Sequence, residues 1–565
     1  MILKALYDYY NRCGNLPAKG MEEKEIGFLI VLSPEGQFLR FEDCRTGKDH
    51  ARTYLVKKHV GRSSAAVANY LYDNSAYVLG YSDKSTGKEQ LYFDTFKAQI
   101  EDIAEAFPDN NEILAVKAFY NNSREEVIQT VSQDPLWEDI KKNLSKKYST
   151  FSFRIEGDLR IVAEKKEILQ LEEQDSSDAK FCLVSGEYGV PVDTTTATMI
   201  PGSQATAKLV AFQVNSGYDS YGKTKCGNAP ISENAEFAYT TALNSMLQKG
   251  SRNKFMLGTR TFVFWASNNN EASIEAEDSL FDFLGFSEEA NDDPNAKITK
   301  VRRVFESIYS GTMKTELDDK FYILGLAPNS ARIAVVYWSE TTLKDFAEKI
   351  LCHFNDMEMH DTRKDKKPYM GIREIISSVT LGGKMSDATP NLPEAVVKSI
   401  FQGLPYPQTL YSACLRRIRA EQKLTITRAA IIKAYLNRQS NYNKKIDIML
   451  DKDNNNQGYL CGRLFAVLDK IQEDANHISS IRERYMNAAS ATPSAVFATI
   501  LNLSVHHSEK LDEGRRIYFE KLKQEIIDKM SAKGFPTHLD LQDQGRFFVG
   551  YYHQRQDFFT SKKEQ

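Results

Sequence analysis

The segment Leu392-Pro393-Glu394-Ala395-Val396-Val397-Lys398-Ser399-Ile400-Phe401 marks a change in the pattern of the chain. From Leu392 onward strand-like runs nearly disappear, and apolar residues recur with helical spacing. Prolines lie near the expected helix starts and glycines near the expected helix ends, as is typical of helical proteins. These residues are Pro393, Pro407, Pro493, Gly403 and Gly534. We therefore predict a helical bundle over residues 392–565.

Upstream of this segment, strand and helix patterns alternate. Apolar runs predict strands at 26–32, 37–41, 181–185, 207–214 and 262–265. Helical spacing predicts helices at 63–72, 99–107 and 233–248, the last of which begins after Pro230 and Ser232. The expected fold class is α+β, with a mixed α/β N-terminal region followed by an all-α C-terminal helical bundle.

An acidic segment separates two parts of the mixed region. Nine acidic residues and no Lys or Arg lie between Glu271 and Asn295, a composition typical of an exposed connection. We expect an N-terminal α+β domain over 1–270, an acidic linker over 271–296 and a small α+β unit over 297–391. In the small unit, strands at 321–326 and 332–338, the turn 327–330 and a helix at 343–354 suit a ferredoxin-like module.

The bulk composition excludes several classes of protein. The 565 residues are 42% hydrophobic and 26% charged, which is ordinary for a globular chain of several domains. No run of 18 apolar residues occurs, and Met1–Tyr10 lacks the basic start and the cleavage site of a signal peptide. Seven scattered cysteines without a C-x-x-C pair favour reduced thiols. We expect a cytoplasmic protein without a membrane segment.

Motifs of known enzyme classes are absent. The chain contains neither G-x-x-x-x-G-K-[ST] nor G-x-G-x-x-G, and the G-x-x-S-x-G at 217–222 is one residue longer than a nucleophile elbow. Residues 451–462 open like an EF-hand loop, but Asn456 stands where that loop needs Gly and Gly462 where it needs Glu. We therefore expect no bound calcium and no cofactor.

A few histidines lie near other metal-binding residue types. Cys352, His353, His360 and Asp361 are close in sequence and suit either a metal site or the His–Asp pair of a phosphohydrolase. Such a site needs further His and Asp ligands, and the sequence shows no cluster that supplies them. We predict no metal and no catalytic residue, and a metal-dependent nuclease using His360 and Asp361 is the alternative.

The segment 215–223 combines residue types that bind nucleic acid. Its glycines permit close backbone approach, its tyrosines offer flat amphipathic rings, and its short polar side chains and lysine bind phosphates or base edges. The alternative to nucleic-acid binding is a structural turn whose tyrosines pack inward. The candidate DNA contacts here are Ser216, Tyr218, Ser220, Tyr221 and Lys223.

A second candidate lies near the N-terminus. Residues 57–64 place three permanent positive charges and a glycine before an expected helix, and asparagines follow. Lysine and arginine bind phosphates, while asparagine both donates to and accepts from base edges. The alternative is a solvated charged loop. The candidate contacts are Lys57, Lys58, Arg62 and Asn74.

Positive charge is concentrated in the last third of the chain. The net charge is −3 overall, but residues 401–565 carry 25 Lys and Arg against 18 Asp and Glu. Residues 401–445 carry nine basic residues against Glu421 alone. We expect a wide basic surface that tracks nucleic acid, with Arg416, Arg417 and Arg428 as contacts. The alternative is charge that serves solubility only.

Several segments together resemble the large subunit of the type I-C CRISPR Cascade complex. The resemblance covers almost the whole chain. It is carried by residues 215–223 with 228–232 and 239–244, by 71–74 with 77–80, by 325–329 with Arg332, by 462–468, and by 545–552.

The resemblance implies a non-catalytic subunit of a crRNA-guided complex. Such a subunit reads a protospacer-adjacent motif in double-stranded DNA, aids duplex opening, holds the displaced single strand and docks a helicase-nuclease. Base pairing then reads the target, while protein reads only the short motif. The implied partners are target DNA, crRNA-bearing backbone subunits, small-subunit copies and the helicase-nuclease. A nuclease and a purely structural scaffold are the competing hypotheses.

The resemblance also implies that the helical C-terminal region is made separately from an internal start. Met449 precedes the helical segments of 449–565 and is the candidate start of this small subunit. One further motif departs from a known pattern. Phe181–Gly186 resembles half of a zinc-binding knuckle without a partner cysteine nearby, so we predict no structural metal there.

Overall fold

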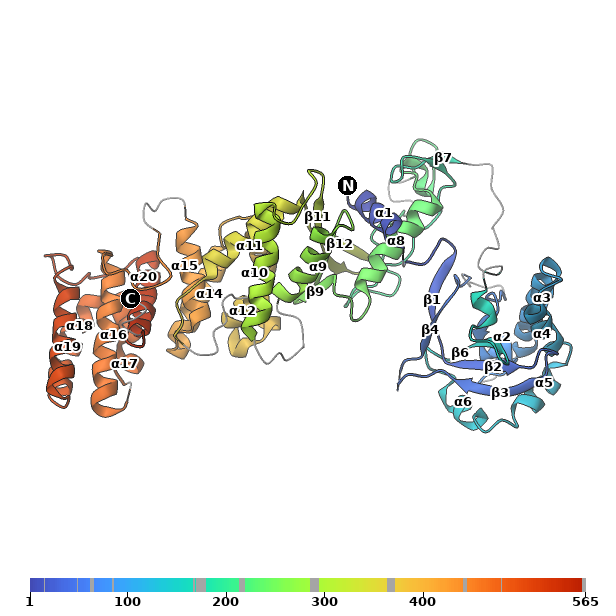
Figure 1. Cartoon of the computed structure of the whole chain (residues 1–565), viewed down its shortest axis with the longest axis horizontal. Helices are drawn as coiled ribbons and strands as arrows, with labels where there is room; N and C mark the ends of the chain where they lie inside the picture. The colour runs from blue at the N-terminus through green and yellow to red at the C-terminus, as the bar shows by residue number, and fades with distance from the viewer. Residues whose placement is uncertain are drawn as a thin grey trace. The chain divides into compact units, whose positions relative to one another are not determined.

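The structure is a computed structural model. It describes residues 1–14, 16–47, 49–60, 66–83, 86–165, 168, 179–212, 219–284, 294–362, 371–439, 445–478 and 480–560, without the side chains of 294–298 and Ser386. The chain forms two units (Figure 1). The inserted unit comprises Cys13–Val192 and Ala229–Thr241, and the main unit comprises Met1–Arg12, Asp193–Asn228 and Ala242–Gln565.

The inserted unit is built on a four-stranded sheet in the order β3-β2-β6-β5. Strand β2 (Phe28–Leu32) is buried at every position and pairs antiparallel with β3 (Phe38–Asp43) and parallel with β6 (Thr150–Ile155). Strand β5 (Tyr72–Asn74) pairs antiparallel with β6. The uninterrupted apolar sequence of β2 reflects its inner position, because both faces of such a strand are covered.

Helices between β5 and β6 cover this sheet. The ring of Phe96 on α3 stacks on that of Phe153 on β6, with centroids 6.2 Å apart. The ring of Trp137 stacks on that of Phe41 on β3 at 6.2 Å. The helices are α2 (Ser75–Val78), α3 (Glu89–Ala106), α4 (Asn111–Phe119), α5 (Arg124–Val131) and α6 (Trp137–Asn143).

Three smaller features complete the inserted unit. Strands β1 (Met21–Ile26) and β4 (Arg52–Lys57) form an antiparallel ribbon. Strands β7 (Lys180–Phe181) and β8 (Tyr188–Gly189) form a short hairpin, and η1 (Val162–Glu164) is a single 3-10 turn.

The main unit begins with an antiparallel sheet in the order β12-β11-β10-β9. Its strands are β9 (Lys254–Leu257), β10 (Arg260–Ala266), β11 (Lys320–Asn329) and β12 (Arg332–Thr342). One face packs on α9 (Glu271–Phe283), α10 (Pro294–Ser310) and α11 (Leu343–Met357). The ring of Phe321 stacks on that of Phe346 with centroids 4.2 Å apart. Helix α1 (Ile2–Arg12) places Tyr9 against Trp265 of β10.

The acidic segment is not an exposed linker over its first half. Glu271–Phe283 forms α9, in which Ala272, Ala276, Leu280 and Phe283 are buried in the core at helical spacing. A count of charged residues does not report this apolar face of the helix. Residues 285–293, the rest of the expected linker except for the start of α10, lie outside the described residues.

The sheet also corrects the expected ferredoxin-like module. Strand β10 pairs with β11 from Thr261↔Leu326 to Ala266↔Phe321, so residues 297–391 share one sheet with residues that precede the acidic segment. Consecutive strands are neighbours throughout, which makes the sheet a simple meander rather than the interleaved ferredoxin-like order. Hydrogen bonding between distant strands, which local patterns do not report, decides this arrangement.

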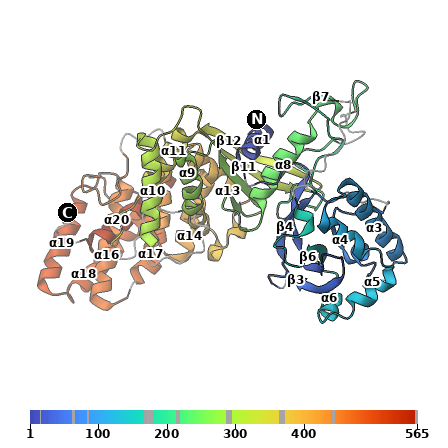
Figure 2. The same ribbon diagram turned by 45° about the vertical axis from the view of Figure 1, so that its right-hand side comes forward.

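Helices make up most of the main unit from Ile372 onward. They are α12 (Ile372–Ser378), α13 (Leu392–Phe401), α14 (Gln408–Glu421), α15 (Ile426–Asn437), α16 (Gln457–Asn476), α17 (Ser480–Ala491), α18 (Pro493–Ser508), α19 (Glu513–Ile527) and α20 (Leu541–Asp557), with 3-10 turns η3 (Leu381–Gly383) and η4 (Met385–Asp387). Helices α16 to α19 lie side by side in both views (Figure 1, Figure 2). The mixed fold followed by a largely helical C-terminal region confirms the predicted fold class.

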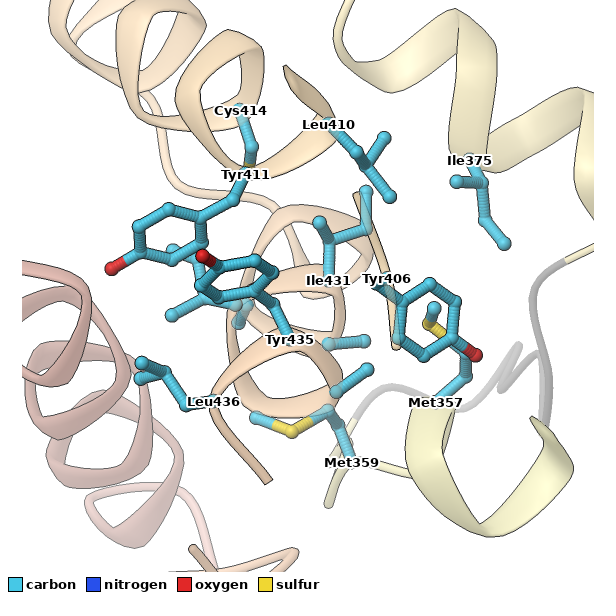
Figure 3. Close-up of a cluster of buried hydrophobic side chains, with 14 of the residues drawn as sticks. Met357, Met359, Ile375, Tyr406, Leu410, Tyr411, Cys414, Ile431, Tyr435 and Leu436 are labelled. Carbon is cyan, nitrogen blue, oxygen red and sulfur yellow. The ribbon is translucent and has the colours of Figure 1, made fainter. Parts of the chain in front are cut away.

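Aromatic and aliphatic side chains fill the core where these helices begin. The rings of Tyr411 on α14 and Tyr435 on α15 lie face to face with centroids 4.2 Å apart (Figure 3). Leu436 and Met359 lie beside them in the same core (Figure 3). This apolar contact joins α14 and α15 to the core that runs through the main unit.

Individual predicted elements had mixed outcomes. The predicted helix 233–248 is α8 (Glu233–Leu247), and the strand 262–265 lies within β10. The predicted helix 63–72 is wrong in its described part, because residues 66–70 are not helical and Tyr72 begins β5. In the segment 207–212, the described part of the strand predicted at 207–214, only an isolated bridge from Lys208 to Arg332 forms.

Candidate nucleic-acid interface

A tight turn over Ser220–Lys223 occupies the segment first singled out in the sequence. The Lys223 N–H donates to the Ser220 carbonyl oxygen at 3.0 Å. The two central residues, Tyr221 and Gly222, have φ of 57° and 69°. Positive φ at both central positions is the requirement of a type I′ turn, and it suits glycine far better than tyrosine.

Neighbouring side chains brace this turn. The Asn228 side chain donates to the Ser220 carbonyl oxygen at 3.0 Å, and the Asp219 carboxylate accepts the Lys225 N–H at 3.3 Å. The Lys225 ammonium forms an ion pair with Asp193. Residues 225–228 form the 3-10 helix η2 (Lys225–Asn228), so the turn is anchored on its C-terminal side.

Tyr221 and Lys223 project from the braced turn. The Tyr221 side chain is 93% exposed, and Lys223 is also exposed. Within the described ranges, neither the Tyr221 hydroxyl nor the Lys223 ammonium makes a hydrogen bond or ion pair. The alternative, a structural turn whose tyrosines pack inward, therefore fails for Tyr221. Ser216 and Tyr218, the other candidates in this segment, lie outside the described residues.

Sequence reasoning missed the residues that hold the turn in place. Gly227 lets the stem of Lys223 pack closely, because a Cβ at 227 would lie 3.0 Å from the Lys223 Cβ. Asn228 and Asp219 supply the bracing hydrogen bonds. The Tyr221-Gly222 pair inside a polar segment was the available signal for a turn, but the bracing residues carry no signal of their own.

Lys57 is buried in the inserted unit rather than exposed in a basic loop. It is 8% exposed, and its ammonium lies 4.7 Å from the centroid of the Tyr70 ring. The Tyr72 hydroxyl donates to the Lys57 carbonyl oxygen at 2.7 Å. Lys58 is exposed, with its ammonium 5.8 Å from the ring centroid of Phe237. Arg62 lies outside the described residues.

Asn74 has a clear local role. Its side-chain oxygen accepts from the N–H groups of Ala76 at 3.0 Å and Tyr77 at 3.4 Å, so it caps the N-terminus of α2. Asparagine is a preferred residue at such a cap. The residue is exposed, but its oxygen is engaged by the helix.

In the described part of 401–445, some basic side chains are buried rather than part of the wide basic surface that the charge count suggested. Arg428 is 5% exposed and donates to Glu421 at 2.5 Å, to the Lys423 carbonyl oxygen at 2.8 Å and to the Ser378 carbonyl oxygen at 3.0 Å. Lys433 is also buried and donates to the Asn355 carbonyl oxygen at 3.1 Å. These charges hold segments of the main unit together.

The two neighbouring arginines of α14 differ from each other. Arg417 pairs with Glu421 one turn further along the helix at 3.1 Å, while Arg416 is exposed. Burial depends on which face of α14 and α15 meets the core, and a charge count carries no such direction. Among Arg416, Arg417 and Arg428, only Arg416 presents an exposed charge.

The half-knuckle at Cys182 is satisfied by backbone groups. The Cys182 sulfur accepts the N–H groups of Val184 and Ser185 at 3.4 Å and of Ser232 at 3.2 Å. Burial by itself raises the pKa of this thiol, but the hydrogen bonds from Ser185 and Ser232 outweigh it and lower the pKa to about 7. Hydrogen bonds of this kind stabilise the thiolate without a metal.

The histidine of the alternative nuclease site, His360, is hydrogen-bonded within the protein. The His360 imidazole lies 3.1 Å from the Thr560 hydroxyl, and Asp361 is buried. Among the residues that the structure describes, no group of three His, Cys, Asp or Glu side chains is placed to hold a metal ion. In the same part of the chain, no helix has the length and apolar character that a membrane span requires.

The chain has a mixed α/β region with a braced turn that carries an exposed lysine, and a largely helical region follows. These features define the class of protein, which is a protein of several modules with a candidate nucleic-acid surface. The family described as CRISPR-associated protein (Cas_Csd1) matches residues 6–559. The chain therefore belongs to this family, the large subunit of the type I-C complex, as its sequence motifs predicted. None of the curated proteins compared with the chain matches it.

Proposed function

We propose that this chain is the DNA-recognition subunit of a crRNA-guided type I-C Cascade complex and catalyses no reaction itself. In this role it reads the protospacer-adjacent motif in double-stranded DNA, aids duplex opening, stabilises the R-loop and docks the helicase-nuclease. Membership of the Cas_Csd1 family over residues 6–559 supports the assembly. The guide pairs with the target while the protein reads a short motif.

The exposed side chains of the turn Ser220–Lys223 carry the proposal for DNA contact. Lys223 offers an unpaired ammonium, within the described ranges, and lies two residues from the exposed Tyr221. A lysine of this kind binds a backbone phosphate, while Ser220 and Asn74 are candidates for contacts that depend on sequence. Lys58 and Arg416 are exposed and are candidates for further phosphate contacts.

Binding of the assembled complex to a randomised motif library tests motif recognition. We expect enrichment of one short motif by the complex that contains the wild-type chain. Lys223→Ala should weaken binding to all duplexes and reduce the slope of log affinity against log salt by about one. Lys314→Ala removes another exposed lysine of the main unit and serves as the control. A library without enrichment would contradict the proposal.

We also propose that Met449 starts a separate small subunit of residues 449–565. Met449 lies in the connection between α15 and α16 and is 46% exposed. Helices α16 to α20 are encoded entirely downstream of it. The rings of Phe465, Phe547 and Tyr551 pack together among these helices, with centroids 5.7 and 5.9 Å from that of Phe465.

An immunoblot against the C-terminus tests the internal start. Expression of the whole gene should give the full chain and a second, short product. Met449→Ala should remove the short product and leave the full chain, because the side chain is half exposed and outside any helix. Persistence of the short product in this variant would place the start elsewhere.

A further inference from the structure

The backbone of Tyr221 adopts a conformation that its side chain does not favour. Its φ of 57° lies in the left-handed region, where non-glycine residues are uncommon and Asn, Asp or Gly are the usual occupants. The turn itself needs only a residue that tolerates positive φ. Tyrosine at this position therefore calls for an explanation beyond the turn.

Packing does not supply that explanation. The side chain is 93% exposed, and within the described ranges its ring makes no contact with another aromatic ring or a cation. A large aromatic side chain usually contributes to a fold by burial, which this one does not. Strained residues with bulky side chains are found where function requires a particular presentation.

Hydrogen bonds hold the backbone that carries the ring in a defined conformation. The Ser220 carbonyl oxygen accepts from the Lys223 N–H and from the Asn228 side chain, both at 3.0 Å. Lys225 is fixed by Asp219 and Asp193. A ring that is exposed but anchored by its backbone loses little further freedom when it stacks on a ligand.

The free charge two residues from Tyr221 indicates the ligand. Lys223 lies two residues from Tyr221 and has no ion pair in the described part of the chain, whereas Lys225 is neutralised by Asp193. An aromatic ring next to a free ammonium is the combination by which proteins bind single-stranded nucleic acid, with a base stacked on the ring and a phosphate at the cation.

We infer that Tyr221 stacks on a nucleobase that becomes unpaired when the target duplex opens, while Lys223 holds the adjacent phosphate. This inference rests on the proposed function and names the ligand of its candidate site. Aromatic and apolar side chains at such positions stabilise an unstacked base step. Tyr221 then favours the opened duplex over the closed one.

Two targets that differ only in base pairing test the inference in the assembled complex. One is a fully paired duplex, and the other has the same sequence with a mismatched bubble beside the motif. Tyr221→Ala should weaken binding to the bubble about tenfold or more, as loss of one base–aromatic stack predicts. Binding to the paired duplex should fall by the same factor or less, because the variant can still bind that duplex in its closed form, which makes no stack.

Further variants separate stacking from the conformation of the turn. Tyr221→Trp should keep binding near the wild-type value. Tyr221→Gly should behave like Tyr221→Ala although glycine relieves the backbone strain, so the loss is not due to a distorted turn. Tyr309→Ala removes a half-exposed tyrosine of α10 and is the matched control. Permanganate reactivity of thymines beside the motif reports opening directly.

The outcomes distinguish this inference from the proposed function. Equal affinities of wild type and Tyr221→Ala for both targets, or a loss confined to the paired duplex, would overturn the stacking role while motif binding stands. If the wild-type complex binds neither target in a motif-dependent way, the proposed function itself fails. Motif-dependent binding by the wild type, with a loss on the bubble in Tyr221→Ala, supports both.

Discussion

Arg428 and Glu421 form an ion pair at 2.5 Å inside the most basic stretch of the chain. Arg428 stands among nine basic residues over 401–445, and Glu421 is the acidic residue of that stretch. The guanidinium also donates to the carbonyl oxygens of Lys423 and Ser378. Arg428, which the charge count of this stretch predicted to contact DNA, therefore joins α12 to the connection between α14 and α15.

Loss of Arg428 should affect stability rather than DNA binding. Arg428→Ala leaves two carbonyl groups without their donor and Glu421 with Arg417 as its remaining partner, which should lower the free energy of unfolding by about 2 kcal/mol. Hydrogen–deuterium exchange in α12 and α15 measures this change. The matched variant Arg416→Ala removes an exposed charge of α14 and should leave exchange unaltered. A reduced salt slope for folded Arg428→Ala, with unchanged exchange, would contradict the structural role.

Lys57 allows a parallel prediction in the inserted unit. Lys57→Ala removes the buried stem and the ammonium over the Tyr70 ring, so we expect a loss of about 1 to 2 kcal/mol in stability. The salt dependence of DNA binding should not change. Lys58→Ala, which removes the exposed neighbour, should leave stability within about 0.5 kcal/mol of the wild type. If Lys57→Ala instead reduced the salt dependence of DNA binding and left stability unchanged, Lys57 would belong to the DNA-binding surface.

The sequence predicted correctly those helices and strands whose signals lie within the element itself. The helix expected at 233–248 and the strand at 262–265 both form, because their apolar spacing and start signals lie within one element. The helical spacing at 63–72 misled, since Tyr72 pairs instead with Ser152 of β6, far along the chain. Propensity is a weak prior when such distant pairing competes with it.

In the candidate site, too, the sequence predicted some features and not others. Residue types predicted that Tyr221 and Lys223 suit nucleic acid, and the structure leaves both side chains exposed. Residue types could not show that Lys57 and Arg428 point inward, because burial depends on which face of a strand or helix meets the core. The family match identifies the assembly, but contacts of single side chains with DNA stay predictions.

Close packing of α16 against α20 gives a further prediction. A Cβ at Gly462 would collide with the backbone carbonyl of Phe547, and backbone cannot move aside as a flexible side chain can. Gly462→Ala should therefore separate the two helices and cost about 1 to 3 kcal/mol. Gly514→Ala, in the first turn of α19, meets only the Asp512 side chain at 3.4 Å and should be neutral or slightly stabilising. Hydrogen–deuterium exchange in α16 and α20 measures the effects of both variants. Equal effects of the two variants would contradict this packing.

His553 should make the helical C-terminal region sensitive to acid. It is 1% exposed, with its Nδ1 2.9 Å from the Tyr459 hydroxyl. Burial, aided by the charges of Lys433 and His360 and opposed by Asp451, lowers the pKa of His553 to about 3.

In the unfolded chain this imidazole titrates near pH 6.5, so above that pH the native and unfolded states hold the same neutral group. Between about pH 6.5 and 3 the unfolded chain binds a proton that the native state excludes. The free energy of unfolding should then fall by up to about 1.4 kcal/mol per pH unit. Exchange in α16 and α20 at pH 7, 6 and 5, corrected for the intrinsic rate, measures this slope. His553→Gln should flatten it, and His506→Gln, at an exposed position, should not. An unchanged slope in His553→Gln would assign the acid sensitivity to other groups.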